Sequence, residues 1–452
     1  MHAESNLAVK QEGKQGSLFI LALLAPLVGA ASGLLGATFR LALDQVDLFR
    51  DTLIARAHEV RLVGFLFVVA ASAGAVAIAA WLVRRFSPPA SGSGIPHVEA
   101  VLTGELPPAP AQLIPVKFFG GLLAIGAGLA LGREGPSVQM GAAIADLIGR
   151  ICRLSWSDRQ VLLAAGACGA RDRVQCADCR RRFRARGTGA AVRCAHRHRR
   201  ARSLGRGDRS GTHAARLCSG SRCRATGLCR YSSVAVFCCA GRVAGLVATF
   251  YNRTLLGAIH AAERLGPWPV ELKAGVIGAT VGILAWFAPG LVGGGDNITQ
   301  HVLAGEAAVA TIPLAFLLRF GLGAVSYAVP IPGGLFAPML VLGAQLGMLF
   351  GASCGLAFPE FGIEPEQFAV VGMAAFFAGV VQAPVTGIVL VTEMTGGFTM
   401  FLPMLAACFS AMLVPTLLHS APIYESLRAR MVRRQQIEDL TRTAGARSGN
   451  SR

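Results

Sequence analysis

Residues 132–136, Gly-Arg-Glu-Gly-Pro, place a charged pair between glycines in a part of the chain that is otherwise apolar. Ionisable groups at membrane depth cost free energy, so they usually face a pore, a substrate or a partner rather than hydrocarbon. Glu134 is therefore a candidate functional residue. A simpler interpretation is that Arg133 and Glu134 form a buried ion pair in a helix bend.

The rest of the sequence has the composition of a polytopic membrane protein. Of its 452 residues, 53% are hydrophobic and 15% are charged, and the mean hydropathy is +0.53. These values argue against an ordinary soluble enzyme. The candidate spans, some of them pairs of shorter helices, are residues 17–43, 62–83, 113–131, 243–247, 274–287, 312–325, 340–356, 368–391 and 401–418.

Two further stretches rich in glycine and proline interrupt the apolar sequence. They are Gly-Ser-Gly-Ile-Pro at 92–96 and Gly-Gly-Leu-Phe-Ala-Pro at 333–338. Each predicts a helix that begins inside the protein, because glycine allows close backbone approach and proline suits the first helical turn. The N–H groups of a first turn have no partner within the helix, and each helix end carries roughly half a positive charge. Several such ends meeting near the bilayer centre would bind an anion and still release it.

The three motifs, GSGIP, GREGP and GxFAP in this order, resemble the CLC family of chloride channels and chloride/proton antiporters. The resemblance runs from about Leu18 to Leu427. It implies an all-α polytopic membrane protein, built as an inverted-repeat bundle of tilted and broken helices. An internal echo supports the repeat, since GREGPSVQMGA is similar to GGLFAPMLVLGA. The supporting motif residues are Gly92, Gly94, Pro96, Gly132, Arg133, Gly135, Pro136, Gly334 and Pro338.

The resemblance also implies a role for individual residues. Ser93 would donate its hydroxyl to a central anion, and Leu335 and Phe336 would donate backbone N–H groups. Tyr424 matches the tyrosine whose hydroxyl completes that site, although an interfacial aromatic residue is the simpler interpretation. Glu134 would be the gate, because a carboxylate imitates a halide in charge and as a hydrogen-bond acceptor. No cofactor is expected, and chloride would be the substrate.

These features predict chloride transport rather than enzymatic activity, with chloride/proton antiport gated by Glu134 as the first choice. A passive chloride channel gated by voltage or pH is a close alternative. A cation transporter is disfavoured, because such a site would normally present carboxylates or backbone carbonyls. The partners expected are chloride, protons, the lipid bilayer and a second copy in a homodimer, without nucleic acid.

The charge pattern suggests how the chain is oriented. We expect a cytoplasmic segment at 1–16, a transmembrane domain at 17–427 and a basic cytoplasmic tail at 428–452. The arginines of the tail favour the cytoplasmic side under the positive-inside rule. The expected location is the cell (inner) membrane.

Residues 167–242 have a different composition from the rest of this domain. Nineteen arginines and three aspartates give this segment +16 of the chain's net +18, and nine of the twelve cysteines lie here. A zinc or nucleic-acid insertion is one interpretation, with Cys176, Cys179, His196 and His198 as ligands. The histidines are only one residue apart, whereas a zinc finger normally separates them by three to five, which argues against a finger.

We interpret the segment instead as translation in the wrong reading frame. Permitted codons for 174–187, read one base later, encode FNAPIAGAVFVLE, which is similar to QAPVTGIVLVTE at 382–393. In the antiporters of the family a glutamate relays protons on the inner side of this repeat, and the reread codons allow Glu-Glu near Gly187 and Thr188. The printed chain has no carboxylate there. An inactive, pseudogene-like product is therefore a third possibility.

Overall fold

The structure is a computed structural model, and it describes residues 2–169, 227–266, 268–359, 364–396 and 398–449. These residues form helices and no strand. The predicted relay position near Gly187 and the residues of the zinc interpretation lie outside the described part. The ends of the arginine-rich segment lie within it, where Ala167 is buried and Phe237 stacks on Phe368 with ring centroids 4.6 Å apart.

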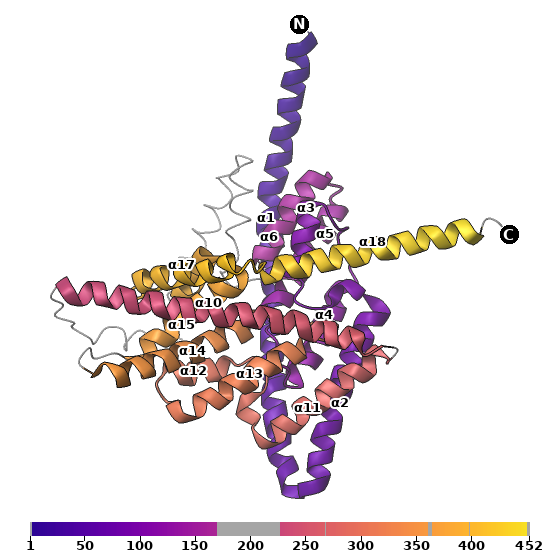
Figure 1. Ribbon diagram of the computed structural model, residues 1–452. Coiled ribbons are helices and arrows are strands. Elements are labelled where there is room, and N and C mark those ends of the chain that lie inside the picture. The colour runs from indigo at the N-terminus through magenta and orange to yellow at the C-terminus, as the bar shows by residue number, and fades with distance from the viewer. Residues whose placement is uncertain (1, 170–226, 267, 360–363, 397, 450–452) are drawn as a thin grey trace.

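The helices before the gap begin with one long rod. The bounds are α1 His2–Ala57, α2 Arg61–Phe86, α3 Ile95–Thr103, α4 Leu113–Gly126, α5 Glu134–Ile151 and α6 Trp156–Gly169, with 3-10 turns η1 His58–Val60 and η2 Pro88–Ala90. No break separates residues 2–16 from the membrane domain, because α1 continues through the predicted boundary between residues 16 and 17. In Figure 1 the start of α1 projects from the bundle.

The helices after the gap include the second long rod, α10. The bounds are α10 Gly227–Arg264, α11 Val270–Phe287, α12 Asp296–Leu303, α13 Ile312–Ser326, α14 Phe336–Ala357, α15 Pro365–Val381, α16 Pro384–Thr395, α17 Phe401–Leu417 and α18 Ile423–Gly449, with 3-10 turns η3 Pro289–Leu291 and η4 Val309–Thr311. The predicted span 368–391 is two helices, because Gln382 adopts φ 58° and Pro384 begins a new helix.

The two halves repeat the same order of elements. A long apolar helix (α2 or α11) leads into a 3-10 turn that begins with proline, then into a short helix (α3 or α12) preceded by a left-handed glycine. A further helix (α4 or α13) and a loop follow, and a motif then starts α5 or α14. The predicted inverted repeat accounts for this order, and the bridge between Gly132 and Gly334 is antiparallel.

Much of the surface of the bundle is apolar, as expected for helices in lipid. Among the described residues, the stretches long and apolar enough to cross a membrane are Ile20–Phe86, Val234–Arg264, Val270–Phe287, Val309–Ser326 and Phe336–Ala357. Small residues bring the buried helices together. A Cβ on Gly343 of α14 would lie 2.7 Å from the Cα of Met373, and one on Gly372 of α15 would lie 2.7 Å from the Cα of Gly347. Close backbone contact of this kind is typical of membrane bundles.

Candidate functional site

Each of the three predicted motifs starts a helix. The motif at 92–96 starts α3 at Ile95, the motif at 132–136 starts α5 at Glu134, and the motif at 333–338 starts α14 at Phe336. None of these three helices has a side-chain hydrogen bond at its N-cap. The prediction of helices that begin inside the protein is confirmed, and the N–H groups of their first turns have no partner within the helix.

Backbone hydrogen bonds join the three motif loops. Gly132 and Gly334 each donate an N–H to the other's carbonyl at 2.7 Å. The N–H of Gly92 donates to the carbonyl of Ile331 at 2.9 Å, and Gly333 donates to the carbonyl of Gly92 at 3.2 Å. The loop before α14 therefore bonds to the loops before both α3 and α5, and the three helix starts converge.

Glycine is required where these loops touch. A Cβ on Gly135 would lie 2.5 Å from the carbonyl oxygen of Ser93, and one on Gly334 would lie 3.1 Å from both the Gly132 oxygen and the Gly135 nitrogen. Gly94, the N-cap of α3, has a left-handed φ of 80°, a conformation that residues other than glycine rarely adopt. The glycines of the motifs thus allow the helix starts to approach one another.

The carboxylate of Glu134 lies close to Gly132, where the loop before α5 meets the start of α14. Its Oε2 is buried and lies 2.6 Å from the place where a Cβ of Gly132 would stand. That same place is 3.0 Å from the backbone nitrogen of Ala337, in the first turn of α14. The predicted gate therefore sits beside the helix start predicted to bind the anion.

Ser93 has a buried hydroxyl that makes no hydrogen bond to any described residue. Its side chain is only 1% exposed, while its backbone N–H donates to the Tyr327 hydroxyl at 3.1 Å. A buried hydroxyl without a partner costs free energy, and an acceptor such as a halide would remove that cost. The structure thus places Ser93 next to Gly135 and hence close to the start of α5.

The other predicted anion ligands are also buried. Leu335 is fully buried, and Phe336 and Tyr424 are 4% and 6% exposed; all three belong to one hydrophobic cluster. Tyr424 is the second residue of α18, which packs against α3, the helix that follows Ser93. Its burial argues against the simpler interpretation of an interfacial aromatic residue.

Two buried cations that the sequence analysis did not single out hold the loops of the short helices. Lys117 of α4 is fully buried, and its Nζ donates to the carbonyls of Ala90 and Gly92 at 2.8 and 2.7 Å. Arg319 of α13 donates to three carbonyls of the loop before α12. These are Leu291 at 3.1 Å, Gly293 at 2.7 Å and Gly294 at 2.9 Å.

The sequence did contain a signal for these two residues. Each is the sole charged residue of an apolar helix, and ionisable groups in such helices deserve a functional or structural explanation. Their bonds fix the backbone just before α3 and α12. Lys117 also brings a buried ammonium group close to Ser93, because the Gly92 carbonyl that it binds belongs to the residue directly before Ser93.

Arg133 bridges two other elements of the fold. Its guanidinium lies 3.5 Å from Asp44 of α1 and 3.2 Å from Asp296, the first residue of α12. The simpler sequence interpretation considered an ion pair of Arg133 with Glu134. Arg133 forms ion pairs with these two carboxylates from distant segments, and the charge of the neighbouring Glu134 also attracts it.

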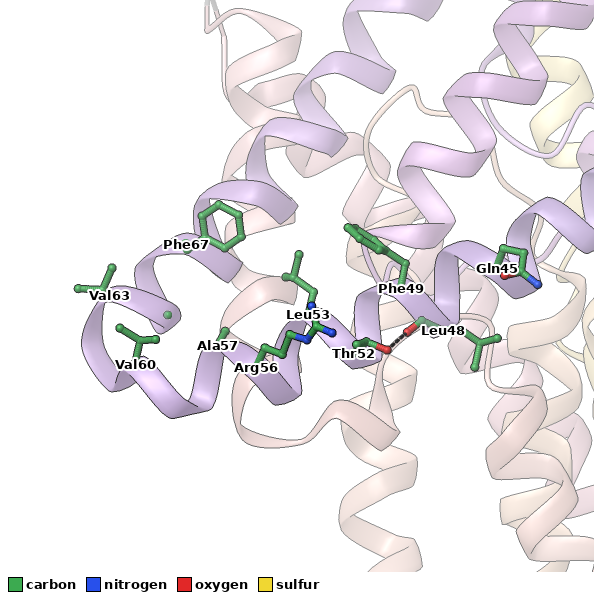
Figure 2. Close-up of a pocket in the computed structure, with 11 residues that line it drawn as sticks. Gln45, Leu48, Phe49, Thr52, Leu53, Arg56, Ala57, Val60, Val63 and Phe67 are labelled. Atoms are coloured by element: carbon green, nitrogen blue, oxygen red, sulfur yellow. Dashed lines mark hydrogen bonds between the residues drawn. The ribbon is translucent and has the colours of Figure 1, made fainter.

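A groove of about 680 Å³ lies away from the motif loops, between α1 and α2 (Figure 2). Its lining is mainly apolar and includes Leu48, Phe49, Leu53, Val63 and Phe67. No residue of the three motifs contributes to this lining. We therefore separate the groove from the candidate site, which is defined by the converging helix starts.

Comparison with known proteins identifies the family. The family described as "Voltage gated chloride channel" matches residues 74–170 and 209–416. An H(+)/Cl(-) exchange transporter ClcA from Vibrio parahaemolyticus is 33% identical over 450 residues, covering 95% of this chain and 94% of the relative. The ClcA transporter of Yersinia pestis bv. Antiqua (strain Angola) is 33% identical over 451 residues, with 94% and 93% covered.

Solved structures agree with this result. A slow cyanobacterial Cl-/H+ antiporter superposes with a TM-score of 0.79 at 30% identity, covering 93% of this chain and 99% of the other. A CLC-type fluoride/proton antiporter shares the fold, with a TM-score of 0.67 at 19% identity and 90% and 97% covered. The family match omits residues 171–208, which lie in the arginine-rich segment. This protein belongs to the voltage-gated chloride channel (CLC) family, as a polytopic helical membrane protein.

Proposed function

We propose that this protein exchanges chloride for protons across the cell membrane. The anion would be held by the Ser93 and Tyr424 hydroxyls and by the backbone N–H groups of Leu335 and Phe336. The observation that supports this most strongly is the place of the Glu134 carboxylate, which lies next to Gly132 at the point where this glycine approaches the Ala337 nitrogen in the first turn of α14. The relatives named H(+)/Cl(-) exchange transporter cover nearly the whole chain, which favours antiport.

In this mechanism Glu134 and chloride compete for the same donors. An ionised carboxylate accepts hydrogen bonds as a halide does, so it occupies an anion position while it is charged. A proton neutralises it and weakens its hold, which opens the position to chloride. The helix N-termini supply only partial charges, and the nearby Lys117 ammonium is occupied by the carbonyls of Ala90 and Gly92, so that binding stays weak enough for release.

Reconstitution in liposomes of protein from a gene with residues 167–242 in the corrected reading frame tests this function. Chloride efflux should drive proton uptake, and the reversal potential should depend on both the chloride and the pH gradients. Glu134→Gln should abolish proton uptake, because the amide cannot exchange a proton. Glu306→Gln is the matched control, since Glu306 lies at an exposed site where it pairs with His301. Unchanged coupling in Glu134→Gln would refute the gate.

A passive chloride channel is the second candidate. The observation that favours it is the printed sequence near Gly187 and Thr188, which offers no carboxylate for a proton relay. A reversal potential that follows chloride alone and ignores the pH gradient would establish the channel and exclude antiport.

We further propose a homodimer with one pathway in each subunit, with both termini in the cytoplasm. The arginines of the tail, including Arg428, Arg430, Arg433 and Arg434, support that orientation. Protease digestion of intact spheroplasts and of inverted membrane vesicles checks it. Cleavage after the tail arginines should occur only in the inverted vesicles.

A further inference from the structure

Arg133 connects the two halves of the protein directly beside Glu134. Asp44 comes from α1 in the first half, and Asp296 begins α12 in the second half. The guanidinium lies between them, 3.5 Å from Asp44 and 3.2 Å from Asp296. Arg133 is one quarter exposed and both carboxylates are about half exposed, so the bridge is reachable by solvent.

The position of Asp296 is set by a well-bonded loop. Arg319 binds the three carbonyls at Leu291, Gly293 and Gly294, and Gly295 takes a left-handed φ of 91° just before Asp296. The N–H of Gly293 donates to the carbonyl of Gly128 at 2.7 Å, in the loop that leads to the Glu134 motif. The carboxylate of Asp296 is therefore presented to Arg133 from a fixed backbone.

Other charged groups near this bridge have partners of their own. Arg50 of α1 lies 2.7 Å from Asp47 and 3.0 Å from Asp51, and its guanidinium also lies beside Gly293. The titratable groups on elements packed around α5 include Arg40, Asp44, Asp47, Arg50, Asp51 and Arg56 of α1, Lys117 of α4, His97 and Glu99 of α3, Asp158, Arg159 and Cys168 of α6, Cys354 of α14, and Asp146 and Arg150 of α5 itself.

Most of these groups are engaged away from Glu134. Lys117 binds the carbonyls before Ser93, and Asp146, Arg150 and Arg159 form ion pairs with one another beyond the middle of α5. Arg133 is the residue before Glu134, and Asp44 and Asp296 are the carboxylates that pair with it. Their balance bears on the proton occupancy of Glu134, because a carboxylate is stabilised in its charged form by a nearby cation and destabilised by nearby anions.

We propose that Asp44 and Asp296 are positioning residues, which hold the Arg133 guanidinium between the two halves and set the pH at which Glu134 is neutralised. This inference rests on the proposed gating role of Glu134. With both carboxylates present, the charge of Arg133 is shared among Asp44, Asp296 and Glu134, and two negative charges are held next to the residue before the gate. Both effects favour the protonated form of Glu134, so the gate opens at a higher pH than it otherwise would.

The test is the pH profile of chloride flux in liposomes. Asp44→Asn and Asp296→Asn should each lower the pH of half-maximal flux by about half a unit, since half-exposed charges are partly screened. The double variant should shift it further in the same direction. Asp296→Glu keeps the charge and should restore the wild-type midpoint, which a purely steric role would not predict.

Asp51→Asn is the matched control on α1, because Asp51 pairs with Arg50 and not with Arg133. An unchanged midpoint in both Asp44→Asn and Asp296→Asn overturns the proposal, as does an equal shift in Asp51→Asn. If Asp296→Asn does not fold, Asp44→Asn decides alone. A pH-dependent flux in Glu134→Gln would instead contradict the proposed gate, so the two failures are distinguishable.

Discussion

Gly132 and Gly334 exchange two backbone hydrogen bonds of 2.7 Å, one in each direction. This pair brings the start of α5 to the start of α14 and leaves no room for side chains between the two loops. Glu134 follows Gly132 by two residues, and Ala337 follows Gly334 by three. The pairing therefore places the carboxylate of one half beside the helix start of the other.

Substitution of Gly135 tests this close approach. The Cβ of Gly135→Ala would press on the backbone of Ser93, which we expect to cost about 1 to 3 kcal/mol, as other overpacked sites do. Thermal unfolding of the purified protein should show a lower Tm. Gly257→Ala is the control, since a Cβ there meets no atom within 4 Å. Equal Tm values for Gly135→Ala and the wild type would show that the loops are not tightly packed.

Removal of the Ser93 hydroxyl should weaken anion binding. The loss of one hydrogen bond of about 0.5 to 1.5 kcal/mol corresponds to roughly two- to twelvefold weaker affinity in Ser93→Ala. Isothermal titration with chloride or bromide measures this change. Ser353→Ala should bind as the wild type does, because the Ser353 hydroxyl is exposed and bonds to the Leu349 carbonyl of its own helix. Wild-type affinity in Ser93→Ala would remove this residue from the site.

The same titration applied to Tyr424→Phe examines the second hydroxyl. The ring stays in its cluster in this variant, so the fold should be unaffected while affinity falls by a similar factor. Tyr251→Phe provides the comparison, since Tyr251 is a buried tyrosine of α10 in the same cluster. Equal weakening in both variants would point to a general effect of buried hydroxyls rather than to a ligand at Tyr424.

Lys117→Met should destabilise the protein strongly. It leaves the Ala90 carbonyl without the Lys117 donor, at roughly 1 to 3 kcal/mol for a buried unpaired group, and leaves the Gly92 carbonyl with only the N–H of Gly333. We expect a lower Tm and slower chloride flux, because the loop that carries Ser93 loses its anchor. Lys273→Met is the control, since this half-buried lysine also donates to two carbonyls but lies far from the motifs in sequence. A Tm loss as large in Lys273→Met would argue against a special role for Lys117.

Resequencing of the gene across codons 167–242 tests the proposed change of reading frame. If this segment formed a transmembrane helix in the printed reading frame, each of its arginines near the bilayer centre would cost about 2.5 to 3.5 kcal/mol. Such arginines include Arg180, Arg181 and Arg182. Protein from a frame-corrected gene should therefore transport chloride, whereas protein from the printed gene should misfold or be inactive. Equal flux from the two genes would disprove the frame interpretation.

The sequence by itself determined where the three central helices begin. Glycine and proline act on the backbone of their immediate neighbours, so the starts at Ile95, Glu134 and Phe336 follow from short motifs. Apolar composition likewise predicted the membrane spans, and the ordered motifs predicted the family. Single charges inside apolar helices could have drawn attention to Lys117 and Arg319, but no local pattern names their partners.

Only the tertiary structure decided which distant groups meet. The pairing of Gly132 with Gly334 depends on how the two halves pack, as do the carbonyls bound by Lys117 and the carboxylates that flank Arg133. Ion pairs and close backbone contacts act over a few ångströms. The number of residues between two positions in the sequence does not say whether they come that close in the folded protein. Local chemistry therefore created the helix starts, and packing between the halves assembled them into one site.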